Sequence, residues 1–583
     1  NVAAAVQWTR RRDPSRLFHY EGTTANGGRN AQVNSFMYPT PEQMTAHARK
    51  RPEMPLILCE YTHAMGNSNG GLSRYWDIFY SDTNMRGGFV WDWVDQGIRQ
   101  PVPPEHREAW KDRPSFLAYG GWWEDRVGVR NDNNFCMNGL VDADRNPHPG
   151  LWAIKYVYRN LHASLVDPAA GRVKVRSWFD FINARELAEG LWEVKADGRT
   201  LASGKLRELD IAPRAEAEFT VPLPALTPEP GVEYWLNLSF VTRTDTAWAR
   251  RGHEIAWDQF KLPVSAPAPP AMPDPPPLEM KEAGSTVHFS GPEFSLDFDK
   301  SAGTISSFTY RGTKLIGRGP LPDFWRAPTD NDRGALKATR KQIAKDPRLN
   351  LPLWRDANQW KIEGVEVKRA GPGSARIEVR AALPAVEAAY RIVYTIYGGG
   401  DVIVEPSYQP GSKPLPMMPR FGAELVLAAG LENIQWYGRG PRETHADRKF
   451  ERVGVYTSTV DKEWVEYSRP QENGNKTDVR WVALTNSKGV GLLAQGLPLL
   501  EVSARHFPKR EIEDSDYWFK MRRRPEIYLN LDGAQMGVGG IDSWSLKAYP
   551  VEAYRIAPDE PHSYRYRLTP VAGDFTGKTR MRW

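Results

Sequence analysis

The residues best able to do chemistry begin with a carboxylate, Glu60. It directly follows residues 55–59 (PLILC), a short apolar run typical of a buried strand. In a parallel α/β barrel the reactive groups lie at the C-terminal ends of the strands, so an acid in this position is placed for catalysis. A glutamate that only caps the strand or forms a salt bridge is the alternative interpretation. The polar and aromatic side chains that come next, including Tyr61, His63 and Asn67, favour a site.

A second apolar run, residues 88–93, ends in another carboxylate and two indoles, in the sequence WDWVDQG. Trp91 and Trp93 share one face of the predicted strand because side chains alternate at period two, and Asp92 lies on the other face. Sugars present apolar C–H faces between their hydroxyl groups, so indole faces beside carboxylates suit a sugar site. Core packing of the two indoles stays open as an alternative.

The segments CEYTHAMGNSNGG and GGFVWDWVDQG resemble the nucleophile region of the long microbial β-galactosidases of glycoside hydrolase family 2. The resemblance implies that Glu60 is the nucleophile that forms a galactosyl-enzyme, that His63 hydrogen-bonds the galactose, and that Trp91 is a platform at the floor of the site. Tyr38, in SFMYPT, resembles the family tyrosine that hydrogen-bonds the nucleophile. Such a phenol would hold the carboxylate in place and tune its basicity. By itself, a tyrosine at a strand end is more often a packing residue.

Two further segments resemble the same family. GVRNDNNFCMNGLVDADRNPHPG is similar to the segment that closes the site and binds Na⁺ or K⁺, which implies the Phe135 carbonyl and the Asn138 side chain as ligands. The resemblance also places Asn138 beside the substrate and implies Asn131 as a ligand of Mg²⁺. Oxygen ligands suit these hard cations, although the residues alone would indicate only a turn-rich loop. LDGAQMGVGGIDSWSLKAYP resembles the loop that stacks Trp544 on the aglycone sugar.

Residues 1–163 predict about half of a (β/α)₈ barrel, a fold that typically needs ~250 residues. The chain opens in helix-like spacing, residues 17–21 and 33–38 read as strands, and helical patterns follow at 41–51 and 149–160. Retaining glycosidases use two carboxyl groups roughly 5 to 5.5 Å apart, a nucleophile and an acid/base. The resemblance puts the acid/base glutamate on an earlier strand, before Asn1. The chain is therefore expected to be inactive alone and to need the N-terminal half of the barrel.

Beyond residue 160 the pattern becomes all-β. Alternating strands with Gly and Pro turns predict an immunoglobulin-like β-sandwich over 164–262, and the proline-dense run 263–277 is typical of a semi-rigid linker. Residues 278–583 open with a hairpin at 294–315. With their motifs FWRAPTDND, WYGRGPRE and RPQENGNKTDVRW, they resemble the large C-terminal β-sandwich of these β-galactosidases, which shorter members such as β-glucuronidases lack. Within 101–128, PVPPEHREAWKDRPSF and WWEDRVG depart from the family pattern.

Bulk composition is that of a large multi-domain α/β plus all-β protein, with 583 residues, 40% of them hydrophobic, and a net charge of +6. Lys+Arg 77 against Asp+Glu 71, with no basic run, argues against nucleic acid. No membrane span, leader or spaced Cys/His zinc motif is present in the sequence. Cys59 and Cys136 are expected to be reduced thiols of a cytoplasmic protein.

These expectations combine into one functional prediction. The chain is expected to belong to a homo-oligomeric retaining β-galactosidase that hydrolyses terminal β-D-galactosides such as lactose, with transgalactosylation as a side reaction. Two alternatives stay open: a non-catalytic carbohydrate-binding β-sandwich protein, and a family relative with another specificity, for example for glucuronides or mannosides.

Overall fold

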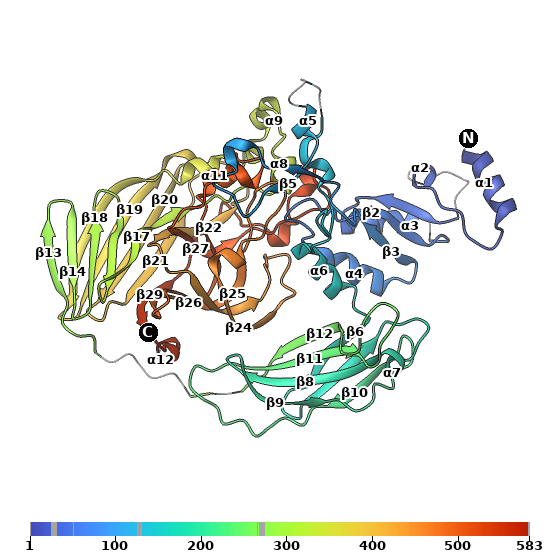
Figure 1. The fold of residues 1–583 in the computed structure, drawn as a ribbon, viewed down its shortest axis with the longest axis horizontal. Helices are drawn as coiled ribbons and strands as arrows, with labels where there is room; N and C mark the ends of the chain where they lie inside the picture. Colours follow the sequence, from blue (N-terminus) through green and yellow to red (C-terminus); the bar gives the residue numbers. More distant parts are fainter. Residues whose placement is uncertain are drawn as a thin grey trace.

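The computed structural model of the protein describes residues 2–24, 32–50, 52–124, 128, 131–264, 266–267 and 274–580. The chain forms three regions, each built on its own sheets (Figure 1). Parallel strands with helices make up the N-terminal region, a two-sheet sandwich lies below it in the view, and one very large sheet forms the C-terminal region. Residue 265 and residues 268–273 of the predicted linker 263–277 fall outside the described residues.

In the N-terminal region three parallel strands lie side by side in the order β1-β2-β3. Helices α3 and α4 connect them, as parallel pairing requires a crossover. Leu56 and Leu58 alternate into the core at period two, and Leu72, Tyr75 and Phe79 form the buried face of α4. The elements are α1 (Val2–Arg12), α2 (Glu21–Thr24), β1 (Asn34–Met37), α3 (Pro41–Lys50), β2 (Leu56–Tyr61), α4 (Leu72–Ser81), β3 (Met85–Val90), β4 (Ile98–Pro101), η1 (Pro104–His106), β5 (Ser115–Ala118), α5 (Gly121–Glu124), η2 (Asn133–Cys136) and α6 (Pro149–Val157).

Two strand predictions in this region need correction. The predicted strand 17–21 is wrong: residues 17–20 have no regular structure and Glu21 begins α2. Leu17 and Tyr20 are exposed, so the apolar residues that suggested a buried strand have no described neighbour strand to pack beside. The predicted strand 88–93 ends earlier, at the last residue of β3, which leaves Trp91 and Trp93 in the loop beyond it.

The middle region is a sandwich of two antiparallel sheets, β10-β7-β6 and β12-β11-β8-β9. Along β8 buried and half-buried residues alternate without a break, which is the pattern of a strand with one face on the core. The strands and the one short helix are β6 (Leu161–Asp167), β7 (Arg172–Ser177), α7 (Ala184–Leu187), β8 (Ala188–Ala196), β9 (Arg199–Lys205), β10 (Glu216–Thr220), β11 (Tyr234–Thr242) and β12 (Glu254–Lys261).

The C-terminal region is one 17-stranded sheet, not the two separate sheets of a sandwich as predicted. Pairings between strands that are not consecutive, such as β17 with β22 and β26 with β29, curl the sheet around one large hydrophobic core. The predicted hairpin at 294–315 is confirmed by the pairing of β15 with β16.

The strands of this sheet are β13 (Glu279–Ala283), β14 (Thr286–Ser290), β15 (Phe294–Asp299), β16 (Thr304–Tyr310), β17 (Thr313–Asp323), β18 (Lys361–Gly371), β19 (Ser374–Leu383), β20 (Ala388–Tyr397), β21 (Val402–Gln409), β22 (Arg420–Leu427), β23 (Asn433–Gly440), β24 (Arg452–Thr459), β25 (Lys476–Thr485), β26 (Val490–Arg505), β27 (Ile527–Gln535), β28 (His562–Ser563) and β29 (Tyr566–Ala572). The helical segments between and after them are α8 (Asp330–Ala335), α9 (Arg340–Lys345), η3 (Pro347–Leu349), α10 (Leu353–Ala357), η4 (Pro384–Val386), η5 (Val460–Glu463), α11 (Lys509–Asp514), η6 (Trp518–Lys520), η7 (Leu546–Ala548), η8 (Glu552–Tyr554) and α12 (Thr576–Thr579).

Two smaller expectations concern the whole chain. Neither Cys59 nor Cys136 forms a disulfide bond within the described residues, in agreement with the expected reduced thiols. None of the helices in the described ranges has the length and apolar character needed to span a bilayer.

Candidate active site

Glu60 lies at the C-terminal end of β2, and its carboxylate accepts a hydrogen bond from the Tyr38 hydroxyl. The two residues meet because β1 and β2 are adjacent parallel strands, whose C-terminal ends share one edge. Burial, followed by the hydrogen bond to Glu60 and its negative charge, raises the pKa of the Tyr38 phenol. The phenol therefore stays protonated and acts as a donor that orients the carboxylate.

The Tyr38 backbone is held in a conformation that its side chain disfavours, with φ at 47°. Its N–H donates to the Glu60 carbonyl at 2.9 Å, and its own carbonyl accepts from Lys547 Nζ at 2.9 Å. A non-glycine residue in the left-handed region costs roughly 1–3 kcal/mol and persists where the surroundings over-determine it. Here two backbone hydrogen bonds, one of them from the C-terminal region, hold Tyr38 in this conformation and so fix the direction of its phenol.

Four of the residues singled out in the sequence form one aromatic cluster beside this carboxylate. Trp544 meets the ring of Tyr38 edge to face at 4.8 Å, and that of His63 at 5.2 Å, between centroids. Phe135 stacks on His63 at 5.3 Å and contacts Trp544 at 5.7 Å. The sequence separates these residues by up to about 500 positions, so the cluster exists only because the C-terminal region folds against the strand ends.

The tautomer of His63 follows from its hydrogen-bond partners. Asn331 Nδ2 donates to the Val538 carbonyl at 3.0 Å, which leaves Asn331 Oδ1 to accept from the Ser543 hydroxyl at 2.7 Å. Ser543 Oγ has then given its only proton, so at 2.9 Å it accepts from His63 Nδ1–H. His63 Nε2 therefore carries a lone pair. Burial lowers the pKa of His63 to about 4, so the ring is neutral and Nε2 is an acceptor at neutral pH.

The loop 62–71 is bound by the C-terminal region. Asn67 Oδ1 accepts from Arg448 at 2.8 Å. Gly70 passes so close to Asp447 that a Cβ there would lie 1.9 Å from the carboxylate oxygen. The Gly and Asn residues of this loop are therefore needed to let two parts of the chain pack together, and they fix the position of the residues that follow Glu60.

Trp91 borders the cluster through the backbone, and 40% of its side chain is exposed. Its carbonyl accepts from the N–H of Ala64 at 2.8 Å, and the next residue, Asp92, donates its N–H to the Asn138 carbonyl at 2.8 Å. The Trp91 backbone is thus tied to the loop that follows Glu60, and the residue is partly exposed. The described residues give it no ring contact with the aromatic cluster.

The two predicted cation sites differ in how well their residues fit an ion. Asn138 is buried, and its Oδ1 has no hydrogen-bond partner among the described residues. A buried oxygen without a donor suits a monovalent cation, so Asn138 fits the predicted Na⁺ site. Asn131 Oδ1 instead accepts from the N–H of Asn133 at 2.7 Å, as in an ordinary turn. Within the described part of the chain no group of three His, Cys, Asp or Glu ligands surrounds Asn131, so these residues do not make a Mg²⁺ site.

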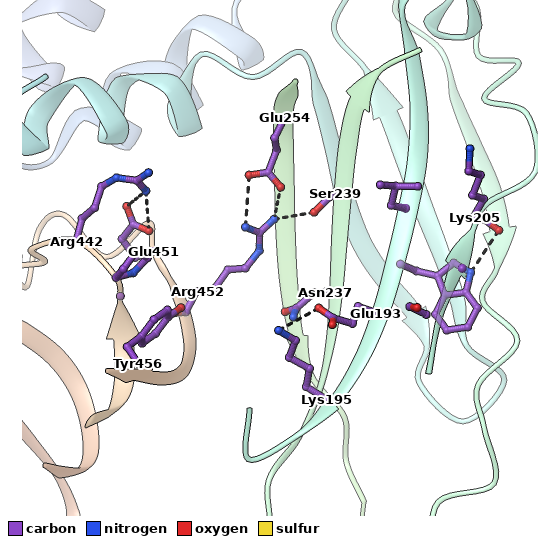
Figure 2. Close-up of a pocket in the computed structure, with 16 residues that line it drawn as sticks. Glu193, Lys195, Lys205, Asn237, Ser239, Glu254, Arg442, Glu451, Arg452 and Tyr456 are labelled. Atoms are coloured by element: carbon purple, nitrogen blue, oxygen red, sulfur yellow. Dashed lines mark hydrogen bonds and ion pairs between the residues drawn. The ribbon is translucent and has the colours of Figure 1, made fainter. Parts of the chain in front are cut away.

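A cavity of about 720 Å³ lies elsewhere, between the sandwich and the large sheet (Figure 2). Its lining charges are already paired: Arg452 reaches Glu254 at 2.6 Å, and Arg442 reaches Glu451 at 3.0 Å (Figure 2). None of the predicted site residues lines it. The convergence of Tyr38 with Glu60 defines the candidate site better than cavity size does.

Family models match the chain in three blocks. Residues 1–163 match the TIM barrel domain of glycosyl hydrolases family 2, residues 173–263 match β-galactosidase domain 4, and residues 290–568 match the β-galactosidase small chain. This chain belongs to the β-galactosidases of glycoside hydrolase family 2. The resemblance seen in the sequence motifs is confirmed.

Individual members of the family agree with this assignment. The β-galactosidase of Priestia megaterium is 35% identical over 563 residues, which cover 96% of this chain and 52% of that protein. Those of Halalkalibacterium halodurans and Vibrio cholerae are 30% and 31% identical, with 96% and 98% of this chain covered and 53% and 54% of theirs. The chain thus spans about half the length of the curated relatives it matches.

Among solved structures, galactose 1-epimerase from Lactobacillus acidophilus superposes with a TM-score of 0.29. It is 10% identical and covers 51% of this chain and 98% of its own. A likeness this weak supports no structural argument.

The sequence motifs of this family 2 chain did not by themselves identify Ser543, Asn331 or Arg448 as parts of the site. A signal was present for each. Ser543 directly precedes Trp544, Asn331 lies within FWRAPTDND, and Arg448 follows WYGRGPRE closely. The motifs could not predict the hydrogen-bond partner of each side chain, because that partner lies hundreds of residues away in the sequence.

Proposed function

We propose that this chain is part of a retaining β-galactosidase in which Glu60 is the nucleophile. The observation that carries the proposal is the buried Tyr38 phenol hydrogen-bonded to Glu60 at the strand ends. Glu60 would attack the anomeric carbon of a terminal β-galactoside such as lactose and form a galactosyl-enzyme, which water or a second sugar then resolves. The transfer to a sugar would be transgalactosylation.

Each residue of the aromatic cluster has a distinct role in this proposal. Tyr38 holds the Glu60 carboxylate so that one oxygen faces the sugar, which reduces the reorganisation needed in the transition state. His63 Nε2 accepts a hydrogen bond from a galactose hydroxyl, because Ser543 takes the proton on Nδ1. Trp91 and Trp544 offer indole faces to the apolar side of the sugars.

We propose that the acid/base carboxyl comes from barrel residues outside these 583. Phe89 at the end of β3 and Trp93 just beyond it are 65% and 60% exposed, an unusual amount for large apolar side chains beside a catalytic strand. The greater length of the relatives supports the same view. The remaining barrel strands would cover these side chains and supply the second carboxyl roughly 5 to 5.5 Å from Glu60.

We also propose that Na⁺ or K⁺ is held by Asn138 Oδ1 and the Phe135 carbonyl. Such an ion would neutralise local negative charge and offer a coordination position to a sugar hydroxyl. The unpartnered, buried Asn138 Oδ1 supports this proposal. Mg²⁺ would need carboxylates beyond the described residues, since Asn131 alone is engaged in a turn.

Domain boundaries at 163, 262 and 277, a homo-oligomeric assembly and a cytoplasmic location complete the proposal. Each region has a large hydrophobic core of its own, which supports the boundaries, and a further cluster packs the N-terminal region against the C-terminal one. The assembly and the location stay predictions from the sequence.

The test is covalent labelling of the protein assembled with the rest of its barrel. An activated 2-fluoro-galactoside should trap a galactosyl adduct, and peptide mapping should find it on Glu60. Glu60→Gln should abolish both the adduct and nitrophenyl-galactoside hydrolysis. Glu42→Gln, the same change at an exposed position of helix α3, is the matched control and should keep both. An adduct on Asp92, or full activity of Glu60→Gln, would refute the assignment.

A further inference from the structure

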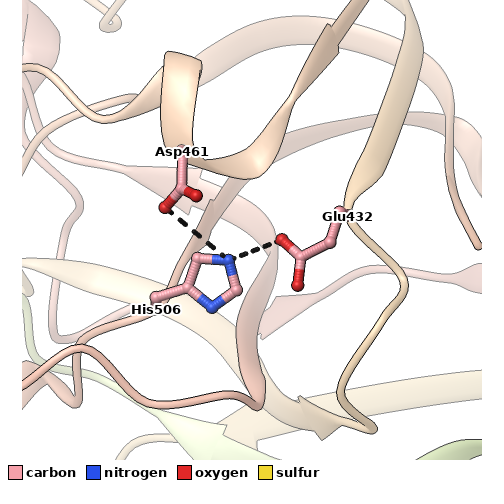
Figure 3. Close-up of side chains that lie close together, drawn as sticks. All are labelled: Glu432, Asp461 and His506. Carbon is pink, nitrogen blue, oxygen red and sulfur yellow. Dashed lines mark hydrogen bonds and ion pairs between the residues drawn. The ribbon is translucent and has the colours of Figure 1, made fainter.

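Three side chains from separate segments of the C-terminal region converge at one point. Glu432 lies between β22 and β23, Asp461 lies in η5, and His506 directly follows β26 (Figure 3). The His506 side chain is only 1% exposed, whereas those of Glu432 and Asp461 are 38% and 58% exposed. A buried imidazole thus forms the floor of a small site, and two carboxylates form its solvent-facing rim.

The orientation of the imidazole is fixed from behind. His506 Nδ1 lies 3.0 Å from the carbonyls of both Arg524 and Glu526, so Nδ1 carries the proton and donates it. Nε2 faces the carboxylates and donates to Glu432 Oε2 at 2.8 Å, so a metal that binds there would displace this proton. Histidines that bind metals are typically held in this way, with the second ring nitrogen donating to a carbonyl or carboxylate.

The three candidate ligand atoms lie close enough together to share one small metal ion. His506 Nε2 lies 2.8 Å from Glu432 Oε2 and 3.9 Å from Asp461 Oδ1, and all three ligand atoms lie within 4.8 Å of one another. Two ligands about 2.1 Å from a tetrahedral zinc ion are about 3.4 Å apart, and the observed distances bracket this value. Small rotations of the two exposed carboxylates would complete the geometry.

We propose that Glu432, Asp461 and His506 form a binding site for a divalent transition metal, with zinc the best match. One imidazole and two carboxylates suit zinc, whereas Mg²⁺ and Ca²⁺ prefer oxygen ligands throughout. With three protein ligands, the fourth position is open to water or to a ligand from another molecule. The absence of a spaced zinc motif in the sequence is consistent with ligands drawn from three distant segments.

Arg523 competes with the metal for the same two carboxylates. Its Nη2 lies 2.9 Å from Asp461 Oδ2 and 3.6 Å from Glu432 Oε2. Its side chain is 40% exposed, so it can turn into solvent when a divalent cation takes over the carboxylates. The guanidinium therefore balances the rim charges in the metal-free protein and lowers its apparent affinity for zinc.

Bound metal would tie the three segments together. The Val460 N–H donates to the Glu432 carbonyl at 3.0 Å, and this bond joins the turn before β23 to the start of η5. A metal would add a link from both to the end of β26. Ligands that bind only the folded state stabilise it, so zinc should raise the thermal midpoint of the region that contains the site.

The experiment uses the full chain, stripped with a chelator and dialysed, and titrated with zinc chloride in a calorimeter. Wild type should bind one zinc ion that is lost or at least tenfold weaker in His506→Gln and in Asp461→Asn. The second variant changes an exposed side chain and so guards against misfolding of the first. His288→Gln is the matched control, because His288 contacts Asp297 at 2.6 Å in a simple exposed pair.

Two further measurements separate the proposal from an ordinary ion pair. Arg523→Gln should bind zinc several-fold more tightly than wild type, because the competing cation is gone. Magnesium chloride should not raise the thermal midpoint, whereas zinc chloride should, and only when His506 is present. The proposal would be overturned if wild type and His506→Gln bound zinc equally well. It would also be overturned if neither wild type nor Arg523→Gln bound zinc, or if magnesium raised the thermal midpoint as much as zinc does.

Discussion

Replacing Ser543 with alanine should disturb both the stability of the site and the tautomer of His63. Ser543 is 3% exposed, and its hydroxyl accepts from His63 Nδ1–H and donates to Asn331 Oδ1. The substitution leaves one buried donor and one buried acceptor without partners. Each such group costs roughly 1–3 kcal/mol, so the free energy of unfolding should fall by about 2 kcal/mol or more.

The chemical consequence concerns His63. Without Ser543, nothing holds the proton on Nδ1, and the tautomer with the proton on Nε2 becomes competitive. His63 Nε2 would then be a hydrogen-bond donor and could no longer accept a hydrogen bond from a galactose hydroxyl, so KM for galactosides should rise in the assembled enzyme. The direct readout is the ¹⁵N shift of the two ring nitrogens in histidine-labelled protein, with His63→Gln used to assign the signals.

Ser545→Ala is the matched control for this prediction. Ser545 lies two residues away in the same loop, and its hydroxyl bonds to Asp542 at a position that water can reach. Ser545→Ala should leave the ¹⁵N signals of His63 unchanged and should lower the free energy of unfolding by less than Ser543→Ala does. If Ser543→Ala keeps both the wild-type unfolding midpoint and the wild-type ¹⁵N shifts, the hydrogen-bond chain described here is not what sets the tautomer.

Three other predictions address the parts that support the site. Burial lowers the pKa of His63 from 6.5 to about 4, so between these two pH values the unfolded chain binds a proton at this residue and the folded chain does not. The stability that depends on this difference, about 3 kcal/mol, is therefore complete above pH 6.5 and is lost as the pH falls towards 4. His63→Gln should flatten this part of a series of urea midpoints measured against pH. Arg420→Met should lower the free energy of unfolding by roughly 3–5 kcal/mol, because it leaves the buried carboxylates of Asp532 and Glu472 without their cationic partner, and an unchanged urea midpoint would contradict this. Gly540→Ala should lower the thermal midpoint more than Gly430→Ala does, since both have positive φ but only the first would place a Cβ against other atoms, 2.6 Å from a hydroxyl oxygen; equal effects would rule out the steric argument.

Local sequence signals predicted the elements around Glu60 well. The apolar run before it, the helical spacing after Gly71 and the turn at 300–303 each depend on residues close together in the chain, and β2, α4 and the β15–β16 hairpin formed as expected. The prediction failed at residues 17–21, where an apolar pattern without a neighbouring strand did not form a strand. A strand needs a partner, and a pattern by itself does not supply one.

Tertiary structure alone decided which side chains share the site and how the C-terminal strands join. The sequence determined that Glu60 ends a strand, that Tyr38 ends the one before it, and that the family is the β-galactosidases of glycoside hydrolase family 2. It could not determine that Ser543 would fix the proton of His63, 480 positions away, or that 17 strands would form one sheet. The physical reason is that periodicity and turn chemistry act over a few residues, whereas contacts between distant segments depend on packing that every part of the fold helps to set.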